Sequence, residues 1–244
     1  MKQLKYFLWR IFKSPERNIV GWKTLFVDFF GRIIIGLNFK KLQPITICIG
    51  IKNRSENLLN LVLESLNSCD NIELITLSVF DTGSNDISHL ENAIKAKWKG
   101  KLIYSKNEQE FTRSSAFNQS IMQAETDIIM ACDADIYLPH DIVKKVNKYT
   151  TKFSNWFPIV WWQSEDKLSG RFFTEGTGIF TSTKRNFINA GMYDETFVEW
   201  GKEDWLLYFS FYKKNMACIR TQEKGMVHSF HKSNKPEGFK PLFN

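Results

Sequence analysis

The chain has 244 residues, of which 43% are hydrophobic and 24% charged, and its formal net charge is +7. This length suits one large domain, or one domain with an appendage, and the balance of apolar and charged residues excludes disorder throughout. The positive charge suits an anionic partner, such as nucleic acid, a phosphate-rich substrate or an acidic membrane face, and it equally suits a basic solvated surface.

The cysteines and the apolar runs bear on the compartment in which the chain works. The cysteines lie far apart, with no C-x-x-C pair: Cys48, Cys69, Cys132 and Cys218. This spacing argues against a structural zinc site or a disulfide framework and favours a reducing compartment. The apolar stretch 6–12 is interrupted by Arg10 and followed by Lys13, unlike a signal peptide, and no later apolar run is long enough to span a bilayer. We therefore expect a cytoplasmic protein.

Residues 1–43 form an N-terminal extension in which basic residues alternate with aromatic and aliphatic ones, as in Trp9-Arg10 and Trp22-Lys23. This composition is typical of a helix that lies in a membrane interface. A helix packed on a catalytic domain explains it equally well, so both interpretations stay open. In the first case the partner is an anionic membrane surface, and the protein is peripheral on the inner face of a bacterial cell membrane.

Pro44 marks the start of the second part, 44–244, in which strands and helices alternate. Apolar runs predict strands at 45–51, 74–80, 101–105 and 127–133, and apolar residues at helical spacing predict helices at 57–66, 87–98 and 112–124. This succession predicts an α/β fold with a doubly wound, mostly parallel sheet, whose ligand binds at the carboxyl ends of the strands.

Acidic residues follow two of these predicted strands. Asp81 closes the second strand, and Asp133 closes the fourth, with Asp135 two positions further on, after Ala134. Two carboxylates so spaced can face one divalent ion together with phosphate oxygens, and oxygen ligands suit Mg²⁺ or Mn²⁺. Burying two unpaired carboxylates without such a purpose would be costly. The pair therefore predicts a metal site, whereas Asp81 could also be a turn former before Gly83.

Three segments resemble glycosyltransferases of the GT-A fold. Segment 111–139 is similar to the β-1,4-galactosyltransferase block F-N-R-A-x-x-x-N-x-G, a helix, a buried strand and D-x-D-x-x-P, with matches at Phe111, Arg113, Asn118, Asp133, Asp135 and Pro139. Segment 194–205 resembles the W-G-G-E-D motif of that family and of bacterial chondroitin-synthase-like enzymes, with matches at Trp200, Gly201, Glu203 and Asp204. Segment 225–236 resembles the block with the metal-binding histidine, where His228 matches best.

The stretches ITICIGIKNRSENL and FDTGSND are similar to family 2 glycosyltransferases generally, so the resemblance covers about 45–236. It implies a nucleotide-binding half at about 44–138 and an acceptor-binding, catalytic half at about 139–244. Lys202 replaces the second glycine of W-G-G-E-D, which leaves the local loop conformation and the acceptor fit open.

The resemblance also implies an activity: an inverting transfer of a hexose from a UDP-sugar to a glycan or lipid-linked saccharide, with Mn²⁺ or Mg²⁺ as cofactor. Galactose is favoured, with N-acetylgalactosamine, N-acetylglucosamine and glucose as alternatives. We expect a role in bacterial surface polysaccharide synthesis and no nucleic-acid partner.

Roles for individual residues follow from the same resemblance. Asp135 and His228 would bind the metal, and Asp133 would help to hold both the metal and the ribose. Asp81 and Arg113 would lie near the nucleotide. Asp204 would accept the proton of the attacking hydroxyl, with Glu203 assisting catalysis. Residues at the acceptor or donor sugar would be Trp200, Gly201 and Glu203.

Simpler interpretations exist for several of these residues. Glu203 and Asp204 open a predicted helix, where acidic residues are favoured anyway. Arg113 could be a surface cation. His228 and His231 could be structural, and their spacing does not decide which one binds metal. The aromatic pairs 161–162 and 172–173 are expected in the core rather than in a sugar site.

Two other classes of function compete with glycosyl transfer. A nucleotidyltransferase can share the sheet and the paired carboxylates, but it normally has a glycine-rich phosphate loop after the first strand. Residues 51–54 offer Lys52 and Arg54 with no glycine run. A noncatalytic nucleotide-sugar-binding module would be expected to lack the base or a metal ligand, yet all four are present: Asp133, Asp135, Asp204 and His228.

Overall fold

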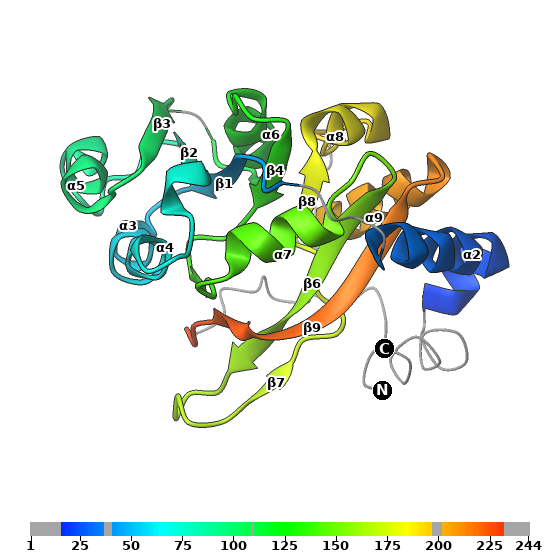
Figure 1. Ribbon diagram of the computed structural model, residues 1–244. Helices are drawn as coiled ribbons and strands as arrows, with labels where there is room; N and C mark the ends of the chain where they lie inside the picture. The colour runs from blue at the N-terminus through cyan, green and yellow to red at the C-terminus, as the bar shows by residue number, and fades with distance from the viewer. Residues whose placement is uncertain (1–15, 37–40, 109, 197–201, 232–244) are drawn as a thin grey trace, which may run out of the picture.

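The computed structural model describes residues 16–36, 41–108, 110–196 and 202–231, with residues 16–25 as backbone only. Within these ranges one sheet is flanked by helices (Figure 1). The strands are β1 (Ile45–Ile51), β2 (Ile75–Asp81), β3 (Lys101–Lys106), β4 (Ile128–Ala131), β5 (Ile136–Tyr137), β6 (Ser154–Gln163), β7 (Gly170–Phe172), β8 (Phe180–Thr183) and β9 (Ala217–His228). The helices are α2 (Glu16–Gly36), α3 (Ser55–Asn57), η1 (Leu58–Val62), α4 (Leu63–Asn67), η2 (Ile72–Leu74), α5 (Leu90–Lys97), α6 (Arg113–Met122), α7 (Ile142–Tyr149), α8 (Lys184–Ala190) and α9 (Glu203–Lys213).

The sheet has the order β3-β2-β1-β4-β8-β6-β9-β5, with β7 paired to β6. Strands β3, β2, β1 and β4 are parallel, as the apolar runs predict. Beyond β4 the sheet is mixed, because β8 pairs antiparallel with both β4 and β6, while β6 and β9 run parallel. The predicted α/β fold is therefore confirmed, and the parallel arrangement is limited to strands β1–β4 and the β6–β9 pair.

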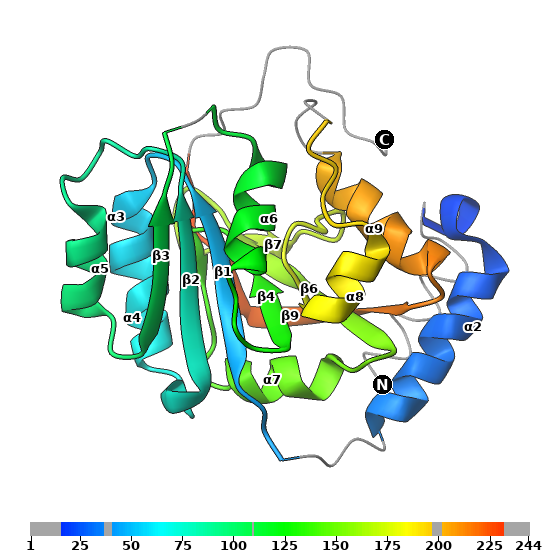
Figure 2. The same cartoon turned by 90° about the horizontal axis from the view of Figure 1, so that it is seen from above.

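Helices cover both faces of the parallel strands, as in a doubly wound fold. Figure 2 shows α3, α4 and α5 on one side of β1–β3 and α6 on the other. Alternate residues of β1 serve the two cores: the isoleucines face α4 and α5, and Cys48 faces α6. A Cβ on Gly50 would lie 2.6 Å from the Cβ of Ala116 in α6, so the close approach of this helix to β1 requires glycine.

Helix α2 lies against the part of the sheet far from β1, beside β9 and α9. Asp28 is 1% exposed: its Oδ1 accepts a hydrogen bond from the Cys218 amide at 2.9 Å, and its Oδ2 accepts one from the Tyr212 hydroxyl at 2.8 Å. A Cβ on Gly31 would lie 2.5 Å from the Cβ of Ala217, so the helix backbone sits directly on β9. One face of α2 is thus packed on the domain. Among the described residues, no helix is both long and apolar enough to cross a membrane.

Candidate active site

Strand pairing brings Asp135 beside two histidines. Strand β5 pairs antiparallel with β9 and sets Ile136 opposite His228. The Asp135 carbonyl accepts a hydrogen bond from the Ser229 amide at 3.0 Å, which extends the pairing past the end of β9. The Asp135 carboxylate then lies 3.2 Å from His231 Nε2 through Oδ2 and 3.7 Å from His228 Nε2 through Oδ1. One ligand atom of each residue lies within 4.8 Å of the others, close enough to share one metal ion.

The protonation states of this trio suit a metal site. Burial raises the pKa of Asp135, but the hydrogen bond from His231 and the charges of His228, His231 and Arg54 outweigh it, so the net pKa is below the usual value. Burial also lowers the pKa of His228 and favours its neutral form. Metals bind the carboxylate and the neutral imidazole. The Oδ1 atom of Asp135 is buried without a hydrogen-bond partner among the described residues, which leaves it open to a cation.

A second cluster is built around Arg113, the first residue of α6. The Thr112 hydroxyl caps the helix by accepting a hydrogen bond from the Ser115 amide at 3.2 Å. The Arg113 side chain lies over the Phe117 ring, 4.5 Å from its centroid. Its guanidinium donates to Asp133 Oδ1 from Nε at 3.3 Å and Nη2 at 3.1 Å, and its Nη1 contacts Asp204. Arg113 is therefore no surface cation, because it joins the end of β4 to the start of α9.

Asp204 has surroundings that suit a general base. Burial, together with the nearby charges of Glu203 and Asp133, raises its pKa to about 7 against the lowering effect of the Arg113 charge. Its Oδ1 also accepts a hydrogen bond from the Tyr193 hydroxyl at 3.3 Å. A base works best when its pKa is near the operating pH.

Glu203 and Asp204 lie in the first turn of α9, as the helix-start interpretation expects, but this position does not account for all of their contacts. Lys202 is the N-cap residue of α9, and its side chain makes no capping hydrogen bond. The Glu203 side chain is 6% exposed, with Oε1 3.9 Å from Arg113 Nη1 and Oε2 without a hydrogen-bond partner among the described residues. Both carboxylates thus face Arg113, although the helix N-terminus still favours their negative charge.

Two predicted donor-binding residues lie outside the metal trio. Asp133 is paired with Arg113, and its side chain is 35% exposed. Asp81 is 1% exposed, and both of its carboxylate oxygens accept hydrogen bonds, from the Ser84 amide at 2.7 Å and the Tyr104 hydroxyl at 2.8 Å. The turn-forming interpretation of Asp81 is therefore correct, and nucleotide contact by Asp81 stays a prediction.

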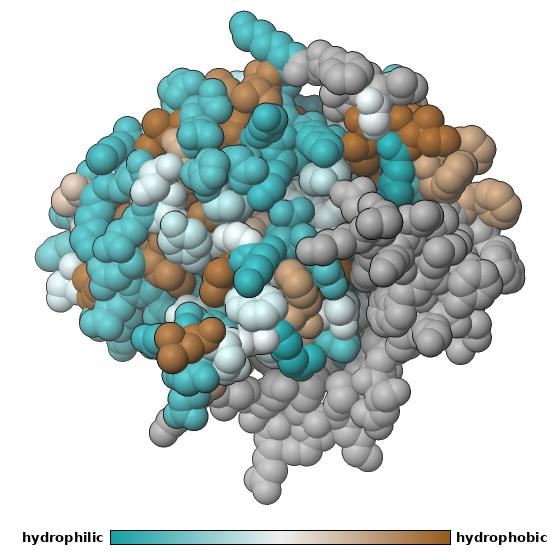
Figure 3. Space-filling model, turned by 60° about the horizontal axis from the view of Figure 1, so that its bottom comes forward, coloured by the Kyte–Doolittle hydropathy of each residue, from teal (hydrophilic) through white to brown (hydrophobic). Residues whose placement is uncertain are grey.

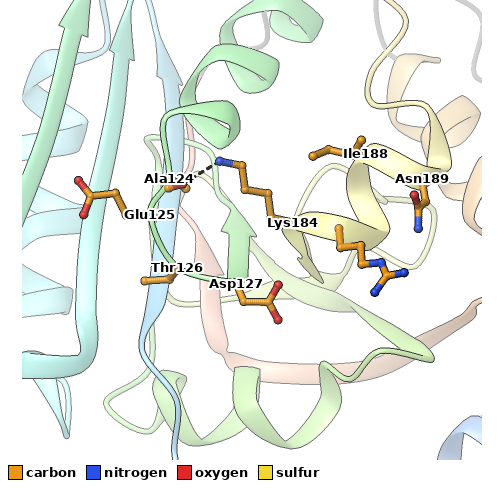
Figure 4. Close-up of a pocket in the computed structure, with 8 residues that line it drawn as sticks. Ala124, Glu125, Thr126, Asp127, Lys184, Ile188 and Asn189 are labelled. Atoms are coloured by element: carbon orange, nitrogen blue, oxygen red, sulfur yellow. Dashed lines mark hydrogen bonds between the residues drawn. The ribbon is translucent and has the colours of Figure 1, made fainter.

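Hollows lie at both ends of the parallel strands. A polar one of about 420 Å³ lies at the carboxyl ends of β1, β2 and β3, next to Asp81, and is lined by Lys52, Gly83, Ser84, Asn85, Lys106, Glu108 and Glu110. A shallow one of about 450 Å³ lies at the opposite end of β4, around 124–127 and α8 (Figure 4). There Lys184 Nζ donates to the carbonyls of Met122 at 2.7 Å and Ala124 at 2.8 Å, so its charge caps the end of α6. The first hollow shares the sheet edge with the predicted site.

The structure adds residues that sequence reasoning missed. Tyr193 was not singled out, yet its hydroxyl reaches Asp204 and its backbone is held by Asn118, which donates from Nδ2 to the Tyr193 carbonyl at 2.9 Å and accepts from its amide at 3.0 Å. Gly178 was also missed: its carbonyl accepts from Arg113 Nη2 at 3.0 Å. Both contacts bridge distant segments, so no local pattern signals them. Trp200 and Gly201 lie outside the described residues.

The aromatic pairs lie beside the site rather than in the core. Trp162 is half-buried, stacks on Phe173 with 4.1 Å between ring centroids, and meets the His228 ring edge-on at 4.8 Å. Trp161 meets Phe172 edge-on at 5.2 Å. The expectation that these pairs are core residues is therefore wrong, because the β6–β7 hairpin extends beyond the helices that cover the sheet (Figure 1).

Comparison with known proteins identifies the family. Residues 46–197 match the model of glycosyl transferase family 2, and the chain belongs to this family. It is 25% identical over 223 residues to human chondroitin sulfate synthase 3, covering 80% of this chain and 25% of that protein. It is 25% identical over 169 residues to mouse chondroitin sulfate N-acetylgalactosaminyltransferase 1, covering 59% of this chain and 32% of that protein. The chain thus spans about a quarter to a third of the length of these relatives.

Solved structures show the same fold. Residues 1–349 of TarS from S. aureus, in complex with UDP-GlcNAc, match with a TM-score of 0.63 at 14% identity, over 79% of this chain and 60% of that one. The mannosyltransferase PcManGT from Pyrobaculum calidifontis, in complex with GDP-Man and Mn²⁺, matches with a TM-score of 0.61 at 12% identity, over 87% of this chain and 66% of that one. The predictions of a GT-A fold and of a glycosyltransferase are confirmed at the level of the family.

Proposed function

We propose that this chain catalyses an inverting, metal-dependent transfer of a hexose from a UDP-sugar to a glycan or glycolipid acceptor. The observation that supports the proposal is that three residues able to share a metal ion lie near a cluster of charged side chains that contains Asp204. Asp135, His228 and His231 form the trio, and Asp133, which Arg113 joins to Asp204, is two residues from Asp135. A nucleotide sugar with its diphosphate at the trio would have its anomeric carbon on the side of Asp204.

The trio fits a divalent cation, and its donor set favours Mn²⁺. One carboxylate and two imidazoles offer oxygen and nitrogen atoms, whereas Mg²⁺ prefers oxygen ligands and retained waters. The bound ion would supply Lewis-acid stabilisation of the charge on departing UDP. The related structures of PcManGT and of GalNAc-T7 are complexes with Mn²⁺, which is consistent with this choice.

The remaining residues would act on the substrates. Asp204, with a pKa of about 7, would accept the proton of the acceptor hydroxyl as the hydroxyl attacks the anomeric carbon, and a single displacement inverts that centre. Glu203, with Trp200 and Gly201, would hold the acceptor or the donor sugar. The polar hollow beside Asp81 would receive the uridine end, and Asp133 would contact the ribose.

The sugar and the acceptor are the finer parts of the proposal. Resemblance to the β-1,4-galactosyltransferases favours galactose, and the names of the chondroitin-synthesising relatives support an N-acetylhexosamine. We place the acceptor among the glycans or lipid-linked saccharides of bacterial surface polysaccharides, with the enzyme at the inner face of the cell membrane.

A donor screen tests the proposal. UDP release is measured with UDP-galactose, UDP-N-acetylgalactosamine, UDP-N-acetylglucosamine and UDP-glucose, each with Mn²⁺ and with EDTA. We expect Mn²⁺-dependent release with at least one donor, and none from the Asp204→Asn variant as matched control. Pyrophosphate release from UTP and a sugar phosphate would instead indicate a nucleotidyltransferase, and UDP binding without turnover of any donor, tested with saccharide acceptors, would indicate a binding module.

A further inference from the structure

Helix α2 has an apolar face that points away from the domain. Its inward face is fixed to β9 and α9 through Asp28, Gly31 and Ile35. The outward face carries large apolar side chains that are 37–63% exposed, and we call it the α2 stripe: Phe26, Phe29, Phe30, Ile33 and Ile34. This 3-1-3-1 spacing places all of them on one side of the helix.

The stripe is a concentration rather than a scatter of exposed side chains. Of the twelve large apolar residues exposed in the described part of the chain, five lie in this nine-residue stretch. Apolar side chains gather at the right of the surface in Figure 3, on the side where Figure 1 has α2. Single exposed apolar residues are ordinary, but a contiguous group marks a surface that another body covers.

The charges in the sequence indicate what covers it. Residues 1–25, which lead into the stripe, contain six Lys or Arg and one acidic residue, Glu16. A second copy of the chain carries the same excess of positive charge, which disfavours it as the occupant of the stripe. An anionic phospholipid surface attracts basic segments of this kind.

The geometry points to α2 as an interfacial helix that attaches the enzyme to an anionic bilayer. The stripe enters the boundary between headgroups and acyl chains, to a depth of about 5–10 Å for helices of this kind. Because the inward face of α2 is fixed to β9, this attachment sets the orientation of the catalytic domain relative to the membrane. The metal trio is at the His228 end of β9, and α2 contacts the Ala217 end, so attachment and catalysis use separate parts of the chain.

Vesicle flotation of the full chain tests the inference. The vesicles are phosphatidylcholine alone, or phosphatidylcholine mixed with phosphatidylglycerol, at low and high salt. The stripe variant is Phe26→Ser, Phe30→Ser and Ile33→Ser together. The matched control changes three similarly exposed apolar residues elsewhere: Phe153→Ser, Leu168→Ser and Ile188→Ser.

We expect the wild type to bind mixed vesicles more tightly than neutral ones, and salt to weaken this binding in part. The stripe variant should lose about tenfold or more in partition coefficient, since each removed side chain contributes apolar burial. The control should bind as the wild type does. Phe30→Ser alone, a milder change, should lose binding in the same direction, and thermal unfolding reports whether each variant is folded.

Other results overturn the inference. Equal partition of the wild type and a folded stripe variant would exclude the stripe as the contact, and so would wild type that does not float. A wild-type dimer in light scattering that becomes monomeric in the stripe variant, without vesicle binding, would identify a second copy as the occupant. Equal binding to neutral and mixed vesicles would show that lipid charge does not contribute to binding, and it would overturn the inference of an anionic bilayer as the partner.

Discussion

The guanidinium of Arg113 contacts the carboxylate of Asp204, although the two residues are 91 positions apart in the sequence. The same guanidinium holds Asp133 Oδ1 at 3.1 Å, so a single cation joins the D-x-D motif to the start of α9. This contact gives Arg113 an effect on the proposed base, in addition to the contact with the nucleotide that the resemblance implies. An Arg113 charge beside Asp204 opposes the effect of burial on the pKa of that carboxyl.

The first prediction concerns Asp204 itself. A base with a pKa of about 7 is active when ionised, so kcat should rise with pH to a plateau, with its midpoint near that value. Asp204→Asn removes the base at nearly constant size and should lower kcat by roughly a hundred- to ten-thousand-fold. Affinity for UDP-sugar with Mn²⁺, measured by calorimetry, should change little. Glu203→Gln is the neighbouring control and should act mainly through KM.

This assignment can fail in two ways. If Asp204→Asn keeps more than about a tenth of wild-type kcat, the loss is smaller than general-base catalysis gives, and another group is the base. If the variant does not fold, the carboxylate has the structural role of a helix-start residue facing Arg113.

The second prediction separates the two roles of Arg113. Removing its charge by Arg113→Gln eliminates the effect that lowers the pKa of Asp204, so that pKa should rise further. The midpoint of the kcat–pH profile should then move to higher pH. The variant should therefore be slower than the wild type at neutral pH and should regain part of this loss in alkaline buffer, where Asp204 is ionised. Arg113→Lys keeps the charge and should move the midpoint less. An unchanged midpoint with a raised KM for UDP-sugar would mean that Arg113 acts on the donor alone.

The third prediction concerns the metal. Asp135→Ala should abolish transfer, and EDTA should inhibit the wild type, with Mn²⁺ restoring activity. His228→Ala and His231→Ala should each weaken Mn²⁺ binding by at least about tenfold, the lower bound for residues that only support a metal ligand. Mn²⁺ affinity is measured by electron paramagnetic resonance without substrate, and His140→Ala, an exposed histidine paired with Asp70, is the control.

Two outcomes would contradict this prediction. If His228→Ala or His231→Ala binds Mn²⁺ as tightly as the wild type, the histidine changed in that variant is not a metal ligand. Full activity of the wild type in EDTA would refute the metal site altogether.

The contrast between His228 and His231 shows how far sequence patterns reach. The strands β1 to β4 were predictable because each contains a run of apolar residues, and Asp135 was singled out because it follows Asp133 at the end of a predicted strand. The choice between the histidines depended on β5, a strand of two residues with no periodicity to detect. Its pairing with β9 brings both rings close to Asp135, and metal binding by either histidine stays a prediction.

The Arg113 cluster could not be derived from the sequence for a related reason. Its members come from α6, the end of β4, the segment before β8 and the start of α9, and only the folded sheet edge brings them together. The motifs singled out Asp133 and Asp204 individually but did not indicate that Arg113 joins them. Tyr193 and Gly178 belong to none of the motifs. No strand was predicted beyond residue 133: β7 and β8 are too short for a periodic signal, and β6 and β9 were not recognised although they span 10 and 12 residues.

The last prediction tests the packing of this cluster through Gly178. A Cβ at this position would lie 2.9 Å from both Arg113 Nη2 and Asp204 Oδ2, closer than such atoms approach. Gly178→Ala should therefore push the guanidinium and the carboxylate apart, although its backbone needs no positive φ. Overpacking of this kind typically costs about 1–3 kcal/mol of stability.

The loss of kcat should exceed what partial unfolding explains, because the displaced groups are the proposed base and the cation that lowers its pKa. Unfolding in urea gives the folded fraction, and kcat is corrected for it. Gly36→Ala is the matched control, since a Cβ there meets nothing within 4 Å, and it should leave both kcat and stability close to wild type. If Gly178→Ala has wild-type kcat per folded molecule, the contact between Arg113 and Asp204 is not needed for catalysis, and the role of Arg113 is confined to the fold or the donor.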